Sequence, residues 1–552
     1  MQDFGAEFGK LIKHQRERLN FTQADLAKEI EITQVALSRM ENGKVARPRA
    51  STEERLSNAL NIEPNEIELL RSGETLEAII ERIQARERAN IEDDLISANL
   101  RKLLEDVIAG RVVSLEALRT LATAFGNTEL TDRGELERFL SLKAEEYRAL
   151  KSEVDSIDDG LKRLSNLKAA AHGAIDRVDL DEVEDLLSRV QEVELEEAAK
   201  TAELRANNAL LRGRVEQAYR ILCAAADSFA AVDPQEPARR RLCYEDTLFQ
   251  HGLRYGGPGI ELSEKMIRQA IPLVPKHTVP QQWADAQNQL GIALQNRGIR
   301  TDGPQGAQLL ADAVTAYRAA LEVHTRADHP VAWAMTKNNL AIALQEQGVR
   351  TDWPQGAQLL VDAVTAYCSA LEVYTRADHP VQWAMTKNNL GNALRDQGMR
   401  TDGPQGGQLL ADAVTAYRDA LEVRTRADHP VDWAATQNNL GNALKDQGSR
   451  TDGPEGAQLL ADAVTAYRAA IEGRTRPDNP VHWAESQVNI AVALAVRAAR
   501  PDAEDARGGL IDALAAVDGA LEVFDPEHMS FHHTNATRLR DFIQSALAAL
   551  PD

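Results

Sequence analysis

Residues 401–450 read TDGPQGGQLLADAVTAYRDALEVRTRADHPVDWAATQNNLGNALKDQGSR, and near-identical units of 50 residues occupy 301–350, 351–400 and 451–500. Five of the chain's six tryptophans recur at the same spacing, from Trp283 to Trp483. A fixed period of this size is typical of a stacked repeat array, in which each unit buries its apolar face against its neighbours. We therefore predict that most of this chain is a one-dimensional solenoid.

Each unit contains the pattern of two helices. In one unit the first helix is expected from Pro380 to Arg400, because proline suits the first helical position and apolar residues then recur at helical spacing. Gly398 is expected to end this helix. The second helix is expected from Gln408 to Thr425, with leucines and small alanines on its apolar face. The predicted fold class is therefore all-α.

The units also resemble a known family. The run Asn389-Leu390-Gly391-Asn392-Ala393-Leu394, followed by Gly398, resembles the first helix of a tetratricopeptide repeat (TPR). Ala413, Tyr417 and Ala420 match the small, aromatic and small positions of its second helix. Because the usual repeat has about 34 residues, the chain resembles a lengthened variant. The resemblance implies a TPR-like α-solenoid whose first helices line a groove for an extended peptide or a partner helix.

The groove residues implied by this resemblance are mainly asparagines. An amide can donate and accept a hydrogen bond at once, which suits recognition of a peptide backbone. The expected positions are Asn338, Asn339, Asn388, Asn389, Asn392, Asn438, Asn439 and Asn442, together with Lys337, Lys387, Arg395 and Lys445. The alternative is that these asparagines only bridge neighbouring helices.

The first 72 residues form a second informative segment. Short helices are predicted at 8–19, 23–29 and 34–41, and a fourth is predicted to begin near Ser51 with a capping box. Thr22 and Thr33 are the candidate N-caps of the second and third helices, and Glu41 is a candidate buried helix partner. Two short helices joined by a turn of three or four residues make a helix-turn-helix unit.

Residues 6–70 resemble the Cro/repressor (Xre-type) family. The matching features include Phe21-Thr22-Gln23, Ile32-Thr33 and Leu37-Ser38, whereas Glu31 stands where the family usually has glycine. The resemblance implies that the helix after the turn enters the major groove of double-stranded DNA. By position, Thr33, Gln34, Val35 and Ser38 would meet base edges, Gln23 would meet a phosphate or assist Gln34, and Arg39, Lys44 and Arg47 would hold phosphates. The alternative is a domain of the same fold that binds protein.

The charge balance limits how DNA can be bound. The chain has 63 Lys and Arg against 85 Asp and Glu, a net charge of −22, so it repels nucleic acid in bulk and any binding to DNA must be local. The first 50 residues carry a net charge of only about +2, which supplies a weak phosphate-binding contribution. We therefore expect a homodimer to be needed for useful affinity.

The predicted domain organisation has five parts. They are a helix-turn-helix head at 1–72, a helical linker or dimerisation segment at 74–160, degenerate repeats at 161–280, regular repeats at 281–500, and a last helix with a capping helix at 501–552. In the linker, helices are expected at 74–88 and 95–108, then from 115 to 125 with Ser114 as cap, and from Thr131 to about Val154. The degenerate part is expected to contain repeat pairs at 199–234 and 236–275.

No catalytic set stands out in the sequence. The three cysteines fit apolar helix faces, and His528, His532 and His533 lack a carboxylate or cysteine to complete a metal site. Neither an enzyme activity nor a cofactor is therefore expected. No run of apolar residues is long enough to span a membrane, and the chain is expected to be cytoplasmic.

Two functional hypotheses follow. The first is a sequence-specific transcriptional regulator whose TPR array senses a peptide or protein. The second is an interaction scaffold in a defence or stress system, which recruits an effector and uses the helix-turn-helix for autoregulation or DNA sensing. In both, DNA and a peptide or protein are the expected partners.

Overall fold

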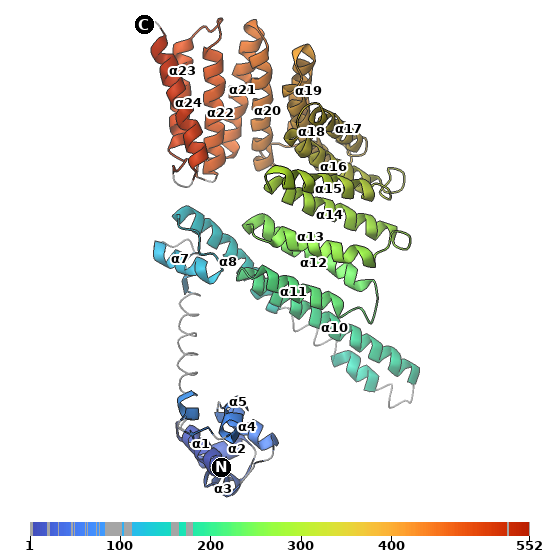
Figure 1. Ribbon diagram of the computed structural model, residues 1–552, viewed down its shortest axis with the longest axis vertical. Coiled ribbons are helices and arrows are strands. Elements are labelled where there is room, and N and C mark those ends of the chain that lie inside the picture. Colours follow the sequence, from blue (N-terminus) through green and yellow to red (C-terminus); the bar gives the residue numbers. More distant parts are fainter. Residues whose placement is uncertain are drawn as a thin grey trace. The chain divides into compact units, whose positions relative to one another are not determined.

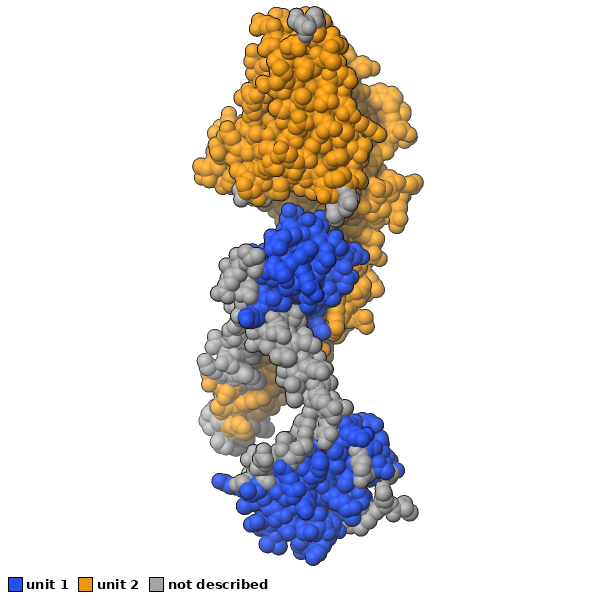
Figure 2. Space-filling view, turned by 90° about the vertical axis from the view of Figure 1, so that its left-hand side faces the viewer, with its two compact units in different colours: residues 1–152, 211–213 blue, residues 153–210, 214–552 orange. Residues whose placement is uncertain are grey.

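The structure is a computed structural model that describes residues 4–18, 22–30, 32–45, 48, 50–60, 62, 64–72, 74–76, 78–82, 102–103, 107, 113–155, 165–172, 180–477, 479–526 and 529–550. Throughout these ranges the regular structure is helical and there is no strand, which confirms the all-α prediction (Figure 1). The chain divides into two compact units, residues 1–152 with 211–213 and residues 153–210 with 214–552 (Figure 2).

The N-terminal head has its own apolar core. Its helices are α1 (Phe4–Arg18), α2 (Gln23–Glu29), α3 (Gln34–Glu41), α4 (Ala50–Leu60) and α5 (Pro64–Ser72). Leu11, Leu26 and Leu37 from the first three helices are fully buried together. The predictions of α2 and α3 are confirmed, whereas α1 begins four residues earlier than predicted. Because α4 already begins at Ala50, Ser51 lies inside the helix, and its predicted capping role was wrong.

Two further helices follow in the first unit, α7 (Leu115–Ala124) and α8 (Arg133–Asp155). The predicted cap at Ser114 is confirmed, because its hydroxyl accepts a hydrogen bond from the backbone N–H of Ala117 at 3.2 Å. The prediction that Thr131 opens α8 was wrong. The carboxylate of Asp132 accepts from the N–H of Glu135 at 2.9 Å, because a carboxylate is a better acceptor at the positive end of a helix. Most of the predicted helices at 74–88 and 95–108 lie outside the described residues.

The array begins with four helices of unequal length, α10 (Leu180–Leu211), α11 (Val215–Asp227), α12 (Glu236–Tyr255) and α13 (Gly259–Ala270), followed by a short 3₁₀ turn, η1 (Ile271–Leu273). The predicted pair at 199–234 corresponds to the end of α10 and to α11, so its first helix is longer than expected. The predicted pair at 236–275 corresponds to α12 and α13, and in the segment that joins them Gly256 adopts a φ of +74°.

Regular helix pairs follow, and they stack side by side (Figure 1). The first helices are α14 (Pro280–Arg300), α16 (Pro330–Arg350), α18 (Pro380–Met399), α20 (Pro430–Arg450) and α22 (Pro480–Ala498). The second helices are α15 (Gly303–Ala320), α17 (Gln355–Leu371), α19 (Gly403–Leu421), α21 (Gly453–Gly473) and α23 (Ala506–Leu521). The chain ends in α24 (Ser530–Ala549), the predicted terminal helix.

One local prediction within the units was wrong. The second helix of the 401–450 unit begins at Gly403 rather than Gln408, since Gly403 at a φ of +69° turns the chain and proline occupies an early helical position. Gly398 lies one residue before the end of α18, close to the predicted end of the helix, and it is buried. A Cβ added there would stand 3.1 Å from the carbonyl oxygen of Gly406, so this glycine permits close approach of the second helix.

A column of tyrosines forms the centre of the array. Tyr317, Tyr367, Tyr417 and Tyr467 are each fully buried, and small alanines surround them. Burial raises the pKa of all four phenols well above the ordinary value, so they are protonated hydrogen-bond donors at neutral pH. One apolar core runs from Phe249 to Ile543 without interruption, as expected for stacked repeats.

Candidate DNA-binding and partner-binding surfaces

Helix α3 is held by a buried ion pair. The guanidinium Nε of Arg16 on α1 donates to the Glu41 carboxylate at 2.6 Å, and both side chains are at least nine-tenths buried. The Gln23 amide donates to the other carboxylate oxygen at 2.6 Å, so Glu41 joins α1, α2 and α3. The hydrogen bond to Glu41 is the main cause that raises the pKa of Arg16. This arrangement supports the predicted role of Glu41 as a buried helix partner.

The opposite end of α3 is open to solvent. Thr33 caps the helix by accepting from the backbone N–H of Ala36 at 3.2 Å, as predicted. Gln34, Arg39 and Lys44 are exposed, and Val35 is 71% exposed, although it is an apolar residue. Ser38 is half-buried and Gln23 is engaged with Glu41. Arg47 and Glu31 lie outside the described residues.

The asparagines of the regular units form a ladder between successive first helices. Asn339 donates to Asn288 at 3.4 Å, Asn439 to Asn388 at 3.2 Å, and Asn489 to Asn438 at 3.2 Å. Asn388 also donates to Asn389 at 3.4 Å, and Asn338 accepts from Thr386 at 3.3 Å. The bridging alternative therefore accounts for these amides, and contact with a ligand remains a prediction.

Asn392 and Asn442 accept hydrogen bonds from the buried tyrosines. Asn392 accepts from the hydroxyl of Tyr417 at 2.6 Å, and Asn442 accepts from Tyr467 at 2.8 Å. In the two preceding units isoleucine replaces this asparagine, and Gln295 and Gln345 accept instead, at 3.0 and 3.3 Å. Each buried phenol thus has an acceptor, supplied from one of two positions on the first helix.

Because the tyrosine hydroxyl finds its acceptor at either of two positions, an acceptor lost at one position should be replaceable at the other. Asn392→Ile should leave the Tyr417 hydroxyl without an acceptor and weaken the α18–α19 pair by about 1–3 kcal/mol. Adding Arg395→Gln should restore most of that loss, because it reproduces the arrangement of Gln345, which accepts from Tyr367 and donates to Asp396 at 2.8 Å. Hydrogen exchange in α18 and α19 measures both effects, with Arg395→Gln alone as the control. A double variant no more protected than Asn392→Ile would contradict this account.

The predicted cations of the groove are also engaged. Lys387 contacts Asp419 at 2.8 Å, and Arg395 donates to Asp446 at 2.6 Å. Burial lowers the pKa of Arg395, but the attraction and the hydrogen bond of Asp446, together with smaller contributions from Tyr417 and Asp396, raise it overall. Lys445 lies 3.2 Å from Asp446, and Lys337 lies 5.7 Å from the ring centre of Trp333. These cations connect units or cover tryptophans.

One repeated residue escaped the sequence analysis. The last arginine of each unit donates to backbone carbonyls at the end of the preceding first helix, for example Arg400 to Gly348 at 2.6 Å and Arg450 to Gly398 at 2.8 Å. The same contact is made by Arg300, Arg350 and Arg500. Carbonyls at a helix end lack partners within the helix and favour a nearby cation. We call these five residues the clamp arginines.

The first helices leave an apolar row exposed. Val331, Val381 and Val431 are 50%, 53% and 58% exposed, and each follows the proline that opens its helix. Met335, one turn after Val331, is 40% exposed. The three valines occupy the same position on successive first helices, so their exposure recurs with the repeat.

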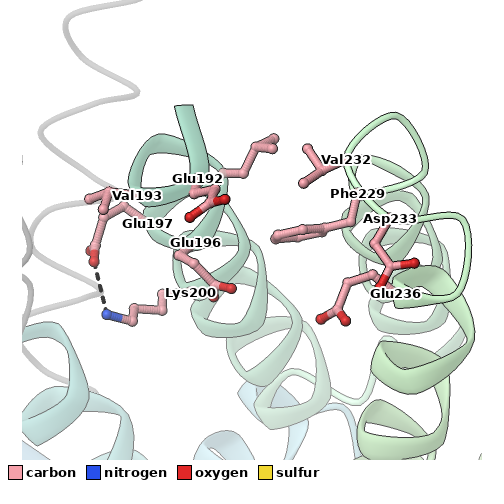
Figure 3. Close-up of a pocket in the computed structure, with 10 residues that line it drawn as sticks. Glu192, Val193, Glu196, Glu197, Lys200, Phe229, Val232, Asp233 and Glu236 are labelled. Carbon is pink, nitrogen blue, oxygen red and sulfur yellow. Dashed lines mark hydrogen bonds and ion pairs between the residues drawn. The ribbon is translucent and has the colours of Figure 1, made fainter. Parts of the chain in front are cut away.

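A cleft of about 540 Å³ lies between α10 and the connection from α11 to α12 (Figure 3). Phe229 and Val232 form its apolar wall, and acidic side chains surround it. Most of these acids are paired: Glu197 with Lys200 at 2.8 Å, and Glu236 with Arg240 at 3.1 Å. The cleft is therefore less acidic than its lining suggests.

The described residues contain no group of three or more His, Cys, Asp or Glu side chains placed to hold a metal ion. Among the helices within those ranges, none is both long enough and apolar enough to cross a lipid bilayer.

Comparison with known proteins gives a family match within the head and a similar solved structure for most of the chain. No curated protein matches the chain. One similar solved structure is a circular tandem repeat protein with novel repeat topology and enhanced subunit contact surfaces, 14% identical, covering 72% of this chain and 91% of that chain with a TM-score of 0.27. The array is identified as a helical solenoid from its own stacked helices and not from this similarity. The Helix-turn-helix family (HTH_3) matches residues 12–67. The head therefore contains a helix-turn-helix domain, joined in one chain to a helical repeat array.

Proposed function

We propose that this protein is a transcriptional regulator that binds a specific DNA sequence through α3 and a peptide or protein through the array. The observation that carries the proposal is the exposed start of α3 within a segment that matches the Helix-turn-helix family. Gln34 can pair with adenine, the methyl groups of Val35 can touch a thymine methyl, and Arg39 and Lys44 can hold phosphates. A homodimer would place two such helices on successive half-sites.

The array supports the second half of the proposal. The row Val331, Val381 and Val431 offers a partner an apolar contact face on successive first helices. Because the asparagine ladder already satisfies many of the amides, we place partner contact on this row rather than on the ladder. A partner alters DNA binding only if its affinity differs between two arrangements of the heads.

The head is tested by fluorescence anisotropy with DNA from upstream of the protein's own gene, at near-physiological salt. We expect Thr33→Ala/Gln34→Ala/Arg39→Ala to abolish specific binding. Each lost base contact costs about 1–3 kcal/mol of binding free energy, and each lost phosphate contact reduces the slope of the binding constant against salt concentration by about one unit. The control substitution is Lys10→Ala, which removes an exposed α1 cation paired with Glu7 at 2.8 Å. Equal, weak binding of the intact protein to this DNA and to a scrambled duplex would refute the operator.

The second candidate function is a scaffold that recruits an effector. The same exposed valine row favours it, because another protein can bind this face whether or not the head binds DNA. The anisotropy experiment separates the two: a scaffold without operator recognition would bind both duplexes alike, whereas a regulator discriminates between them.

A further inference from the structure

A pocket of about 660 Å³ lies among α11, α12 and α13, in the degenerate part of the array. Its lining includes Tyr219 and Cys223 from α11, Arg241 from α12, and Lys265 and Gln269 from α13. The volume is within the range of about 300–1,000 Å³ that holds small ligands. None of these residues belongs to the exposed valine row or to α3, so the pocket is independent of the function proposed above.

Two buried polar groups in this pocket lack a close hydrogen-bond partner among the described residues: the hydroxyl of Tyr219, which lies near the side chains of Cys223 and Gln269, and the Nε of Arg241. Tyr219 is 8% exposed and Arg241 is 7% exposed. The remaining guanidinium nitrogens of Arg241 donate to Asp227 at 2.6 Å and to the carbonyl of Pro237 at 3.4 Å. Buried donors are normally satisfied, and leaving them unpaired costs free energy, so both groups indicate a missing acceptor.

The charge around these donors is positive. Arg220, Arg241 and Lys265 line the pocket, whereas Asp227 is its one carboxylate. The Nζ of Lys265 lies over the ring of Tyr219, 5.2 Å from the ring centre. Burial is the main cause that raises the pKa of Tyr219 to about 12, so the phenol keeps its proton at neutral pH. In a chain of net charge −22, this local excess of cations selects for an anion.

The pocket also departs from the pattern of the regular units. Ala218, Leu222 and Ala225 of α11 have the spacing of Ala413, Tyr417 and Ala420 in α19, so Tyr219 corresponds to the residue after Ala413. That residue is valine in all four regular units, at positions Val314, Val364, Val414 and Val464, where it packs in or against the core. A phenol at this position brings a hydrogen-bond donor to a place that the other units fill with a methyl group.

We propose that this pocket binds a small organic oxyanion, whose oxygens face Tyr219, Arg241 and Lys265 and whose apolar body lies against Ala224 and Leu273. Leu273 is 39% exposed and supplies an apolar surface at the rim. The oxyanion is a carboxylate or a phosphate monoester, since both offer acceptors to a hydroxyl, an ammonium and a guanidinium N–H.

The test is isothermal titration calorimetry of the full chain with three probes that share an aromatic ring. Benzoate and phenyl phosphate are the two oxyanions, and benzylamine is a cation of similar size. We expect heat from at least one oxyanion and none from benzylamine, and the tighter of the two oxyanions identifies the group that the pocket takes. Silence with both oxyanions, or equal binding of benzylamine, would overturn the proposal.

A matched pair of variants assigns the binding to this pocket. Tyr219→Phe removes only the unpartnered hydroxyl and should weaken the oxyanion about 10- to 100-fold, the usual effect of a hydrogen bond to a charged group. Tyr244→Phe removes the other buried phenol of this region without a partner, which lines a different cavity, and should change nothing. If Tyr219→Phe binds as tightly as the intact protein, the assignment is wrong.

The cysteines give a second readout on the unmodified chain. Cys223 lines the pocket, whereas Cys243 and Cys368 are exposed elsewhere. Burial is the main cause that raises the pKa of the Cys223 thiol, so alkylation is best followed at mildly alkaline pH. The oxyanion that binds should slow the alkylation of Cys223 and leave the rates of the other two unchanged. Equal slowing of all three thiols would show a non-specific effect and would contradict the proposal.

Discussion

Glu41→Ala should unfold the head of this protein while leaving its array intact. The substitution leaves the Arg16 guanidinium buried without its carboxylate and also removes the acceptor of Gln23. Breaking a buried ion pair in this way costs about 3–5 kcal/mol, most or all of the stability of a domain this small. We expect operator binding to be lost and amide exchange in α1 and α3 to become fast.

The stability of the head and that of the array can be monitored separately. All six tryptophans lie at or after Trp283, so their fluorescence reports the array and should not change in Glu41→Ala. Glu17→Ala is the control, because Glu17 is 56% exposed and contacts the same arginine at 3.4 Å. Arg16→Met/Glu41→Leu should recover much of the lost stability, because apolar residues of similar size replace such pairs well. A slow-exchanging head in Glu41→Ala would show that the pair contributes little.

Tyr417→Ala should produce the largest loss in the array. The side chain is fully buried against Gly391, where a Cβ would stand 2.7 Å from its ring, so no neighbour can fill the space without moving the backbone. Replacing a large buried aromatic residue by alanine costs about 3–5 kcal/mol. Because each unit contacts only its neighbours, we expect fast exchange in α18, α19 and α20, with α14 and the head unchanged.

Two comparisons define the cause of this loss. Tyr417→Phe keeps the ring and loses only the hydrogen bond to Asn392, so it should cost about 1 kcal/mol. Phe542→Ala removes an aromatic side chain that is 61% exposed, and it should be nearly neutral. If Tyr417→Ala opened the whole array at once, the description of the units as nearest-neighbour modules would be wrong.

Much of the fold was predictable because it depends on local pattern. The helix-opening prolines placed the first helices, and the cap at Thr33 placed α3, since both are properties of a few consecutive residues. The beginning of the second helices was missed because Gly403 enters the helix from a left-handed conformation, which no apolar periodicity reveals. Gly398 lies near the predicted end of its helix, but its close approach to Gly406 was not foreseen, because the sequence does not show which neighbour a glycine faces.

The surfaces were less predictable, because they depend on pairs far apart in the chain. The predicted asparagines are on the first helices, but whether an amide faces a ligand or the next unit is decided by a contact about 50 residues away, as for Asn388 and Asn439. The clamp arginines had a visible signal, one arginine before each Thr-Asp, yet their acceptors are backbone carbonyls, which no sequence displays. The sequence alone did not indicate a role for Tyr219, because its pocket is formed by residues from three different helices.

The clamp arginines also bear on how this gene can change. Each unit carries both halves of the contact, an arginine that reaches backwards and a carbonyl that receives the next arginine, for instance Arg450 and Gly448. If recombination between the near-identical stretches removed residues 401–450, Arg500 would meet Gly398, and Asn489 would meet Asn388. These two joints would be rebuilt from parts of the same kind, whereas Arg395 would lose Asp446 and stand opposite Val496. The clamp and the asparagine ladder therefore permit a change of array length in whole units, and the paired charges of α18 limit which units can be lost.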